Sequence, residues 1–336
     1  MVLRRAIRLG RRVAASLTLL FIATSQSSCL FNTGDIELFS FKPKPLEEHV
    51  VSGRAGDKIL LLDISRVISN QSDSSSWPPG QQQSVVARVE AELQLASADP
   101  EVKAVIIRIN SPGGTVTASD ILYHRIMRFK KQRDVPVIAL FVDMGTSGAY
   151  YAALAADEIV AHPTTVTGSI GVVMHSINLV GLMDKLGVHD QTVKTGAKKD
   201  IGSPLRDMTA DERTLLESVL DDMQSRFMAL VRERRTGLSE EAQREIADGR
   251  ILSAGRAKDI GLVDRIGYLD DTVALAQQMA GLPESRLIMY RRPDEMSETA
   301  YSRAAAQPSV INLIQLELGP LLATPQFLYL WMPPSL

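Results

Sequence analysis

The sequence predicts an α/β fold in which a parallel sheet is covered by helices on both faces. Two observations carry this prediction. Three runs, at residues 58–68, 102–110 and 135–141, are apolar almost throughout. Segments in which apolar residues recur at helical spacing separate these runs. Strands that are apolar on both sides and alternate with helices are typical of a parallel sheet buried on both faces.

The predicted elements follow one another in a regular order. They are a strand at 58–68, a helix at 83–99, a strand at 102–110, a helix at 118–131, a strand at 135–141 and a helix at 147–156. Further along, Thr209 and Glu212 have the spacing of a capping box, in which two side chains satisfy the first free N–H groups of a helix. A long amphipathic helix therefore begins there.

The first 29 residues have the order of an export signal. Five arginines precede an apolar stretch at residues 13–24, and small polar residues then lead to Cys29. Twelve apolar residues are few for a span that needs about 20, which favours a cleaved signal over a stable anchor. Cys29 stands where bacterial lipoproteins carry their lipid, but Gln26 replaces the usual aliphatic residue. Lipidation of Cys29 and an uncleaved or differently cleaved segment near the membrane both stay open.

Composition and the positions of proline suggest how the rest of the chain is organised. Residues 30–57 are predicted to be a linker, 58–283 the catalytic domain and 284–336 a C-terminal extension. The apolar tail of the extension is interrupted by proline, so we expect it to pack on the body or on a neighbouring subunit. A net charge of −2 argues against nucleic-acid binding. A single cysteine excludes a disulfide within the chain.

Ser147 is the first candidate for chemistry. It lies in the sequence "GTSGA", which is close to the turn that exposes the nucleophile of α/β-hydrolases. A serine at the start of a helix can instead be an N-cap. The hydrolase order requires a histidine late in the chain, and the last 147 residues contain none. A lysine with a lowered pKa can replace histidine as the base, and "GAKKD" offers Lys198 and Lys199, although such a run can also be a solvated turn.

Five motifs, taken in order, resemble the signal peptide peptidase A (protease IV) family of serine-lysine peptidases. The resemblance extends over residues 58–282, and the single copy of the motifs is similar to the short form of the family. The motifs are "RINSPGG" at 108–114, "TSGAYYAALAADEIVA" at 146–161, "TGSIGVV" at 167–173, "GAKKD" at 196–200 and "ADGRILSAGRAKDIGLVDRIG" at 247–267.

The resemblance assigns roles to individual residues. It implies that Ser147 is the nucleophile, that Lys199 is the general base and that Ser169 orients the lysine. It also implies that the "SPGG" loop forms the oxyanion hole, with the N–H groups of Gly114 and Gly148 as donors. Physical chemistry agrees, because a glycine has no Cβ and its N–H can approach a tetrahedral oxyanion closely.

The resemblance also implies a fold and a biological setting. The fold is the caseinolytic-protease/crotonase type, a spiral of βαβ units assembled into a homo-oligomer. The expected protein is a membrane-associated serine endopeptidase of the bacterial cell envelope, with its catalytic domain outside the cytoplasm. It would cleave signal peptides or other apolar peptides, with no metal or cofactor and no nucleic acid as a partner. Two alternatives remain: a Ser-His-Asp peptidase that uses His162 or His175, and a catalytically silent scaffold of the same fold.

Overall fold

The computed structural model describes residues 44–71, 83–293 and 326–331. These residues belong to one compact unit that spans Pro43–Leu336. The predicted export signal and Cys29 lie outside the described residues. Within the described ranges, no helix combines the length and the apolar character that a membrane span requires.

The first half of the unit alternates strands and helices as predicted. The elements are β1 (Glu47–Ser52), β2 (Asp57–Ser65), α2 (Val85–Ala98), β3 (Val102–Ser111), β4 (Gly113–Thr115), α3 (Val116–Arg133), β5 (Val137–Thr146), α4 (Gly148–Ala153), β6 (Glu158–Ala161) and β7 (Val166–Gly168). Ser84 and Thr115 cap α2 and α3 by accepting hydrogen bonds from backbone N–H groups of the first turn.

The second half begins with shorter strands and contains the longest helix described. Its elements are β8 (Val173–Met174), α5 (Val180–Leu186), α6 (Ala210–Arg234), α7 (Glu240–Ile246), β9 (Ile251–Ser253), α8 (Ala254–Asp259), β10 (Arg265–Ile266), α9 (Leu269–Ala280), β11 (Ser285–Arg291) and β12 (Phe327–Leu330). The capping box predicted at Thr209 and Glu212 is present, and α6 begins directly after it.

The main sheet of the described residues is largely parallel. Its strands follow the order β1-β11-β2-β3-β5-β6-β10, with β7 paired to the end of β5 and β9 paired to β7. Strand β1 is antiparallel to β11, and β9 is antiparallel to β7, whereas the other pairs are parallel. A second sheet has the order β4-β12-β8. The predicted α/β class with helix-linked parallel strands is confirmed.

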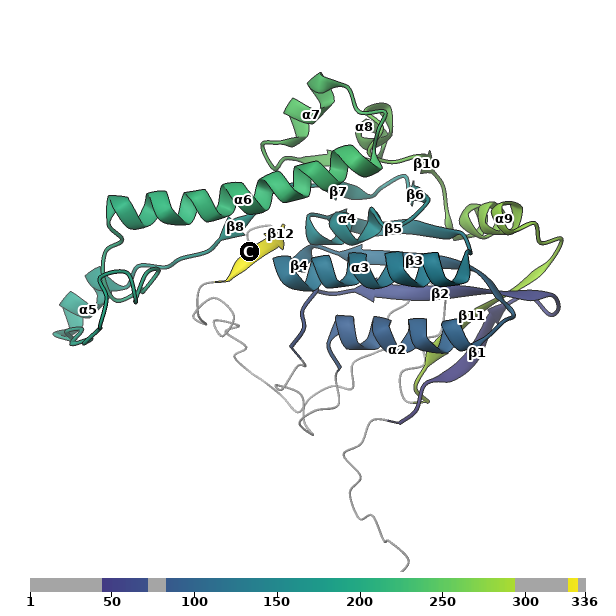
Figure 1. Cartoon of the computed structure of the whole chain (residues 1–336), viewed down its shortest axis with the longest axis horizontal. Coiled ribbons are helices and arrows are strands. Elements are labelled where there is room, and N and C mark those ends of the chain that lie inside the picture. The colour runs from purple at the N-terminus through teal and green to yellow at the C-terminus, as the bar shows by residue number, and fades with distance from the viewer. Residues whose placement is uncertain (1–43, 72–82, 294–325, 332–336) are drawn as a thin grey trace, which may run out of the picture. The chain divides into compact units, whose positions relative to one another are not determined.

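Both faces of the main sheet are buried, as the apolar runs predicted. Along β2, Leu60 and Leu62 face the larger core with helices α2 and α3, which lie side by side (Figure 1). The alternate residues Ile59 and Leu61 face a smaller core that α9 covers. This two-residue alternation between cores is the geometry of an extended strand.

The folded unit is wider than the predicted domain of residues 58–283. Strand β1 comes from the predicted linker and β11 from the predicted C-terminal extension, and the two pair with each other at the edge of the main sheet. Lys58 helps to hold this edge through ion pairs of 2.9 Å with Glu48 and 2.8 Å with Asp99. The predicted linker and the predicted extension thus each contribute one strand, and an edge strand with alternating polar residues such as β1 lacks the apolar run of a central strand.

Candidate active site

Ser147 occupies the sharp turn between β5 and α4. Its φ of 53° and ψ of −118° are unusual for a residue with a side chain, and the surrounding packing has to hold them. The residue is 1% exposed, and within the described residues its Oγ has no hydrogen-bond partner. Although Ser147 stands at the N-cap position of α4, its side chain makes no capping hydrogen bond. The capping interpretation therefore leaves this hydroxyl unexplained.

Two glycine N–H groups lie beside this turn. A Cβ built on Gly148 would lie 3.2 Å from the backbone nitrogen of Gly114 and 2.2 Å from the hydroxyl of Ser119. A Cβ built on Gly114 would lie 1.9 Å from the carbonyl oxygen of Ile68. Neither position has room for a side chain, so the backbones of the two glycines approach each other closely.

Ser169 is brought next to Ser147 by the sheet. Strands β5 and β7 are parallel, with Thr146 opposite Gly168, and the N–H of Ser147 donates a 2.8 Å hydrogen bond to the Gly168 carbonyl. Ser169 itself has a φ of 50° and is buried, and its N–H donates to the carbonyl of Arg250 at 2.7 Å. The structure thus gathers four of the predicted site residues: Ser147, Ser169, Gly114 and Gly148.

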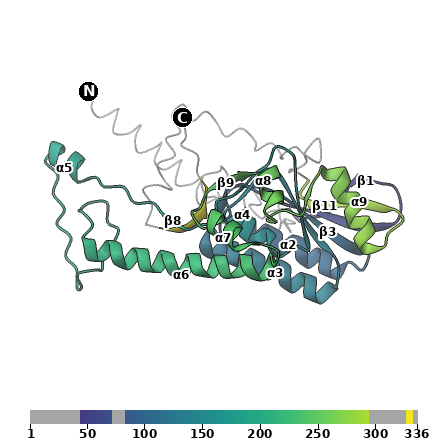
Figure 2. The same ribbon diagram turned by 90° about the horizontal axis from the view of Figure 1, so that it is seen from above.

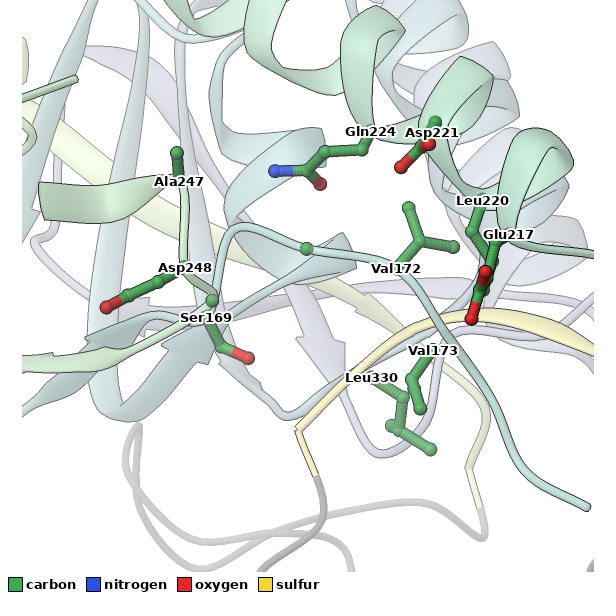
Figure 3. A pocket seen from close by; sticks show the side chains of 12 residues that line it. Ser169, Val172, Val173, Glu217, Leu220, Asp221, Gln224, Ala247, Asp248 and Leu330 are labelled. Atoms are coloured by element: carbon green, nitrogen blue, oxygen red, sulfur yellow. The ribbon is translucent and has the colours of Figure 1, made fainter. Parts of the chain in front are cut away.

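An open cavity of about 390 Å³ lies beside Ser169 (Figure 3). Helix α6 forms one wall and contributes the carboxylates of Glu217 and Asp221, while Asp248 lies on the opposite side. Asp248 is paired with Arg250 at 2.6 Å. Leu330 of β12 also lines the cavity. A space with an acidic wall on α6 next to a buried serine is suited to admit a cationic group.

Lys199 is not part of this cluster. It is exposed, on a segment at residues 175–209 that we call the arm, which includes α5. The next residue, Asp200, accepts hydrogen bonds from Lys194 at 2.6 Å and Arg206 at 2.7 Å, and these bonds lower the pKa of its carboxyl. Arg206 also donates to Glu212 at 2.6 Å and lowers the pKa of Glu212 to about 2. The arm is therefore fastened to the first turn of α6.

The length of α6 separates the arm from the serine. Near the other end of this helix, the ring of Phe227 packs on Tyr151 of α4 with 5.0 Å between ring centroids. From Glu212 to Phe227 the helix rises by about 22 Å at about 1.5 Å per residue. Figures 1 and 2 both place α5 beyond the end of α6 that is remote from α4. A single chain in this conformation does not bring Lys199 to Ser147.

The histidines do not supply a base to Ser147 either. The Nδ1 atom of His162 lies 2.9 Å from the hydroxyl of Thr164, and its ring packs edge-on against Tyr268. His175 is exposed after β8. Neither is hydrogen-bonded to the Ser147 Oγ. Within the described part of the chain, no group of three histidine, cysteine or acidic side chains is placed to hold a metal ion.

Sequence reasoning missed one component beside the site, the strand β12. It lies between β4 and β8 and pairs antiparallel with both. Tyr329 at its centre is completely buried against Tyr151 and Phe227. The sequence analysis predicted that the apolar tail packs on the body or on a neighbour but predicted no strand. The only signal was a short apolar run with two aromatic side chains.

A buried serine on a strained strand-to-helix turn, with two closely approaching glycine N–H groups, is the arrangement of a serine hydrolase. Comparison with known proteins specifies the class. Residues 129–283 match peptidase family S49. A putative signal peptide peptidase SppA from Enterococcus faecium is 32% identical over 259 residues, which are 77% of this chain and 74% of that protein. The chain belongs to peptidase family S49 and is a serine peptidase, which confirms the predicted family.

Other relatives are matched over a smaller share of their length. A putative protease from Methanocaldococcus jannaschii is 38% identical over 57% of this chain and 61% of its own length. Protease 4 from Salmonella typhi is 32% identical over 60% of this chain and 32% of its own length.

Two solved structures resemble the chain weakly, each with a TM-score of 0.40. A ClpP1 mutant from Listeria monocytogenes is 19% identical and covers 63% of this chain and 92% of its own. A mutant of the 1510-N membrane-bound stomatin-specific protease is 15% identical and covers 66% of this chain and 85% of its own. The fold class rests on the chain's own sheet rather than on these two likenesses.

Proposed function

We propose that this serine peptidase is an endopeptidase whose active site is completed by a second copy of the chain. Ser147 of one copy is the nucleophile, and Lys199 from the arm of another copy is the general base. The observation that carries the proposal is the separation within one chain: Ser147 is buried beside α4, whereas Lys199 is exposed beyond the far end of α6. A homo-oligomer is therefore the expected active form.

The chemistry follows from the four gathered residues and the incoming lysine. The neutral amine of Lys199 takes the proton of Ser147 as Oγ attacks the peptide carbonyl carbon. The N–H groups of Gly114 and Gly148 donate to the oxyanion that forms. The lysine then gives its proton to the leaving amine. A water molecule, deprotonated by the same lysine, hydrolyses the acyl ester and regenerates Ser147.

The cavity beside Ser169 supports an approach of the lysine from outside. Glu217 and Asp221 on its wall attract a cation during the approach. Once the amine is buried near Ser169, desolvation disfavours its charged form. The Ser169 hydroxyl then orients the neutral amine toward Ser147 by a hydrogen bond. In this proposal the two carboxylates attract the charged lysine as it approaches, and burial then favours the neutral amine that can accept a proton.

The proposed substrates are apolar peptides such as cleaved signal peptides. The name of the Enterococcus relative supports this class. The arginine-rich and apolar order of residues 1–29 supports an exported, membrane-associated protein with its catalytic domain outside the cytoplasm. Mass spectrometry of the mature N-terminus tests this placement. A lipid on Cys29 or cleavage near residue 29 is the expected result, and an intact N-terminus in a cytoplasmic fraction would overturn it.

Mixing two inactive variants tests the shared site. Ser147→Ala and Lys199→Ala are each expected to lose hydrolysis of an apolar fluorogenic peptide, while Lys198→Ala, the matched control, keeps it. After the two inactive variants exchange subunits, activity returns to about a quarter of the wild-type value, because one site in four pairs an intact serine with an intact lysine. Activity that stays absent in a confirmed mixed oligomer would place the lysine and the serine in the same copy.

A further inference from the structure

The chain that leaves β2 runs beside the glycine loop. Ile68 and Gly114 form a parallel bridge. The N–H of Ile68 donates a 2.7 Å hydrogen bond to the Gly113 carbonyl, and the Ile68 carbonyl accepts a 3.0 Å hydrogen bond from the N–H of Thr115. Ile68 is completely buried in the larger core. A single residue is therefore hydrogen-bonded to the backbone on both sides of Gly114, one of the two proposed oxyanion donors.

The hydrogen bond from Ile68 fixes the direction of the Gly114 N–H. A peptide group is planar and trans, so its C=O and its N–H point in opposite directions. The peptide group between Gly113 and Gly114 directs its C=O at the Ile68 nitrogen. Its N–H, which belongs to Gly114, therefore points away from Ile68. A Cβ built on Gly113 would lie 2.8 Å from the nitrogen of Gly148, so the second proposed donor is close to the same peptide group.

Ser111, the last residue of β3, ties residues 66–68 to the glycine loop. The residue is completely buried. Its hydroxyl donates a 2.5 Å hydrogen bond to the carbonyl of Arg66 and accepts a 3.2 Å hydrogen bond from the N–H of Gly113. Arg66 has a φ of 81°, which a residue with a side chain seldom adopts, and Gly113 has a φ of 102°, which favours glycine. One hydroxyl thus joins two unusual backbone turns, each just before a partner of the bridge between Ile68 and Gly114.

We propose that Ser111 is a positioning residue of the peptidase. Its hydroxyl holds residues 66–68 against the glycine loop, and this contact keeps the Gly114 N–H aimed at the oxyanion of the tetrahedral intermediate. The inference rests on the proposed function, in which Gly114 and Gly148 donate to that oxyanion. Ser111 acts through Ile68 and Gly113 rather than on the substrate itself.

The effect of Ser111 is expected in the transition state. The full negative charge on the substrate oxygen develops only there, so a donor aimed at that charge raises kcat more than it tightens substrate binding. Removing an oxyanion donor outright lowers kcat about a hundredfold to a thousandfold. In Ser111→Ala the Gly114 donor is displaced rather than lost, so we expect kcat and kcat/KM to fall together by about tenfold to a hundredfold, with KM nearly unchanged.

Steady-state hydrolysis of an apolar fluorogenic peptide by the full chain, under assembling conditions, tests this expectation. The matched control is Ser84→Ala, which removes another buried hydroxyl, the N-cap of α2 that accepts from the Ala87 N–H. Both variants are expected to unfold at lower urea concentration than the wild type, but only Ser111→Ala is expected to lose kcat. A kcat of Ser111→Ala within about twofold of that of Ser84→Ala would overturn the inference.

Ser111→Cys keeps the test decisive if the alanine variant does not fold. A thiol is similar in size to the hydroxyl and retains a weak donor and a weak acceptor. Its kcat is expected to lie between those of the wild type and Ser111→Ala. A Ser111→Cys protein with the kcat of the wild type would contradict a positioning role for the hydroxyl.

A peptide aldehyde labelled with ¹³C at its carbonyl carbon reports on the donors directly. The Ser147 Oγ adds to that carbon, and the former carbonyl oxygen becomes the hemiacetal oxygen that the proposed donors hold. Nuclear magnetic resonance follows the ionisation of this oxygen as the pH rises. We expect its pKa to be higher in Ser111→Ala than in the wild type or Ser84→Ala, because well-aimed N–H groups favour the charged form. The same pKa in all three proteins would refute the role of Ser111.

The outcomes separate the two proposals. If Ser147→Ala abolishes hydrolysis but Ser111→Ala raises KM and leaves kcat unchanged, the inference fails and the proposed function stands. If the wild type does not hydrolyse the peptide, or if Ser147→Ala is as active as the wild type, the proposed function and the inference fail together.

Discussion

Ser147 and Ser169 directly follow two neighbouring parallel strands, and both have a positive φ, 53° and 50°. Residues with side chains seldom adopt a positive φ, and such strain is found where surrounding structure holds a functional group. The hydrogen bond from the Ser147 N–H to the Gly168 carbonyl couples the two turns. We therefore expect a backbone shift at one serine to displace the other serine as well.

We expect Ser169→Ala to lower kcat about tenfold to a hundredfold with little change in KM, because the proposed base loses the hydroxyl proposed to orient it. A steady-state pH profile of both Ser169→Ala and Ser169→Thr checks this. The alanine variant should show its activity limb at a different pH, because the lysine has lost a partner, and the threonine variant should restore the wild-type limb. A uniform loss with an unchanged profile in both variants would indicate a purely structural role for Ser169.

Gly114→Ala is expected to damage both fold and activity. The new Cβ would lie 1.9 Å from the Ile68 carbonyl oxygen and 2.5 Å from its carbon, so the backbone must shift. We expect a loss of about 1–3 kcal/mol in the free energy of unfolding and a fall of about a hundredfold in kcat from the displaced N–H. Urea denaturation and steady-state kinetics measure the two effects.

Gly255→Ala is the matched control, because nothing lies within 4 Å of a Cβ built there, on α8. Alanine in a helix is expected to raise stability by up to about 1 kcal/mol and to leave activity unchanged. Equal stability of the Gly114→Ala and Gly255→Ala proteins would refute the close approach at Gly114.

Glu212→Gln is expected to loosen the arm. The hydrogen bond from Arg206 and the capping box at Thr209 hold the pKa of Glu212 at about 2. A carboxyl with a depressed pKa stabilises the fold above its unfolded pKa of about 4.3, and this contribution is lost as the pH falls toward 2. Hydrogen exchange of residues 196–206 should be faster in Glu212→Gln at pH 7 and unaffected in Glu233→Gln, an exposed control on the same helix. Activity should fall together with arm protection.

The buried pair of Asp63 and Arg108 makes stability depend on pH. Burial alone raises the pKa of Asp63, but the charges of Arg108 and Arg88 outweigh it, and the pKa lies below its ordinary value. The stabilisation is therefore present above the unfolded pKa of about 3.9 and is lost as the pH falls through the folded pKa. We expect Asp63→Asn to cost about 3 kcal/mol at pH 7 by removing the buried carboxylate that pairs with Arg108.

Urea denaturation of the Asp63→Asn and wild-type proteins between pH 7 and pH 3 checks this dependence. The difference between the two should shrink below about pH 4. Asp211→Asn, at an exposed carboxyl in the first turn of α6, should stay within about 0.5 kcal/mol of wild type throughout. A difference that is constant with pH would show that the Asp63 carboxylate is not the source of the effect.

The central fold was predictable because apolar runs such as residues 102–110 report burial on both faces of a strand directly. The position of Ser147 on its turn was predictable because small residues on both sides mark a tight strand-to-helix connection. Strand β1 was not, because its alternating pattern at the edge of a sheet differs little from that of a loop.

The position of Lys199 in the fold and the existence of strand β12 also could not be predicted from the sequence. Lys199 is sequentially close to Ser169, but the distance that matters is set by how far α6 carries the arm from the sheet, which no local pattern encodes. Strand β12 is four residues long, and its partners β4 and β8 lie more than 150 residues earlier in the chain. Long-range pairing of so short a strand has almost no signature in a single sequence.

The two halves of the proposed dyad also differ in how firmly the chain protects them. Every residue of α4, which directly follows Ser147, is buried, so its amides open to solvent only when the core does. Helix α5 has no buried residue, and Val193 is 98% exposed, so the arm presents its backbone to any attacking protease. Limited proteolysis should therefore cut the arm first and leave a folded body that is unable to supply the proposed base to its neighbour. Proteolytic damage would thus silence the proposed assembly one arm at a time, without unfolding it.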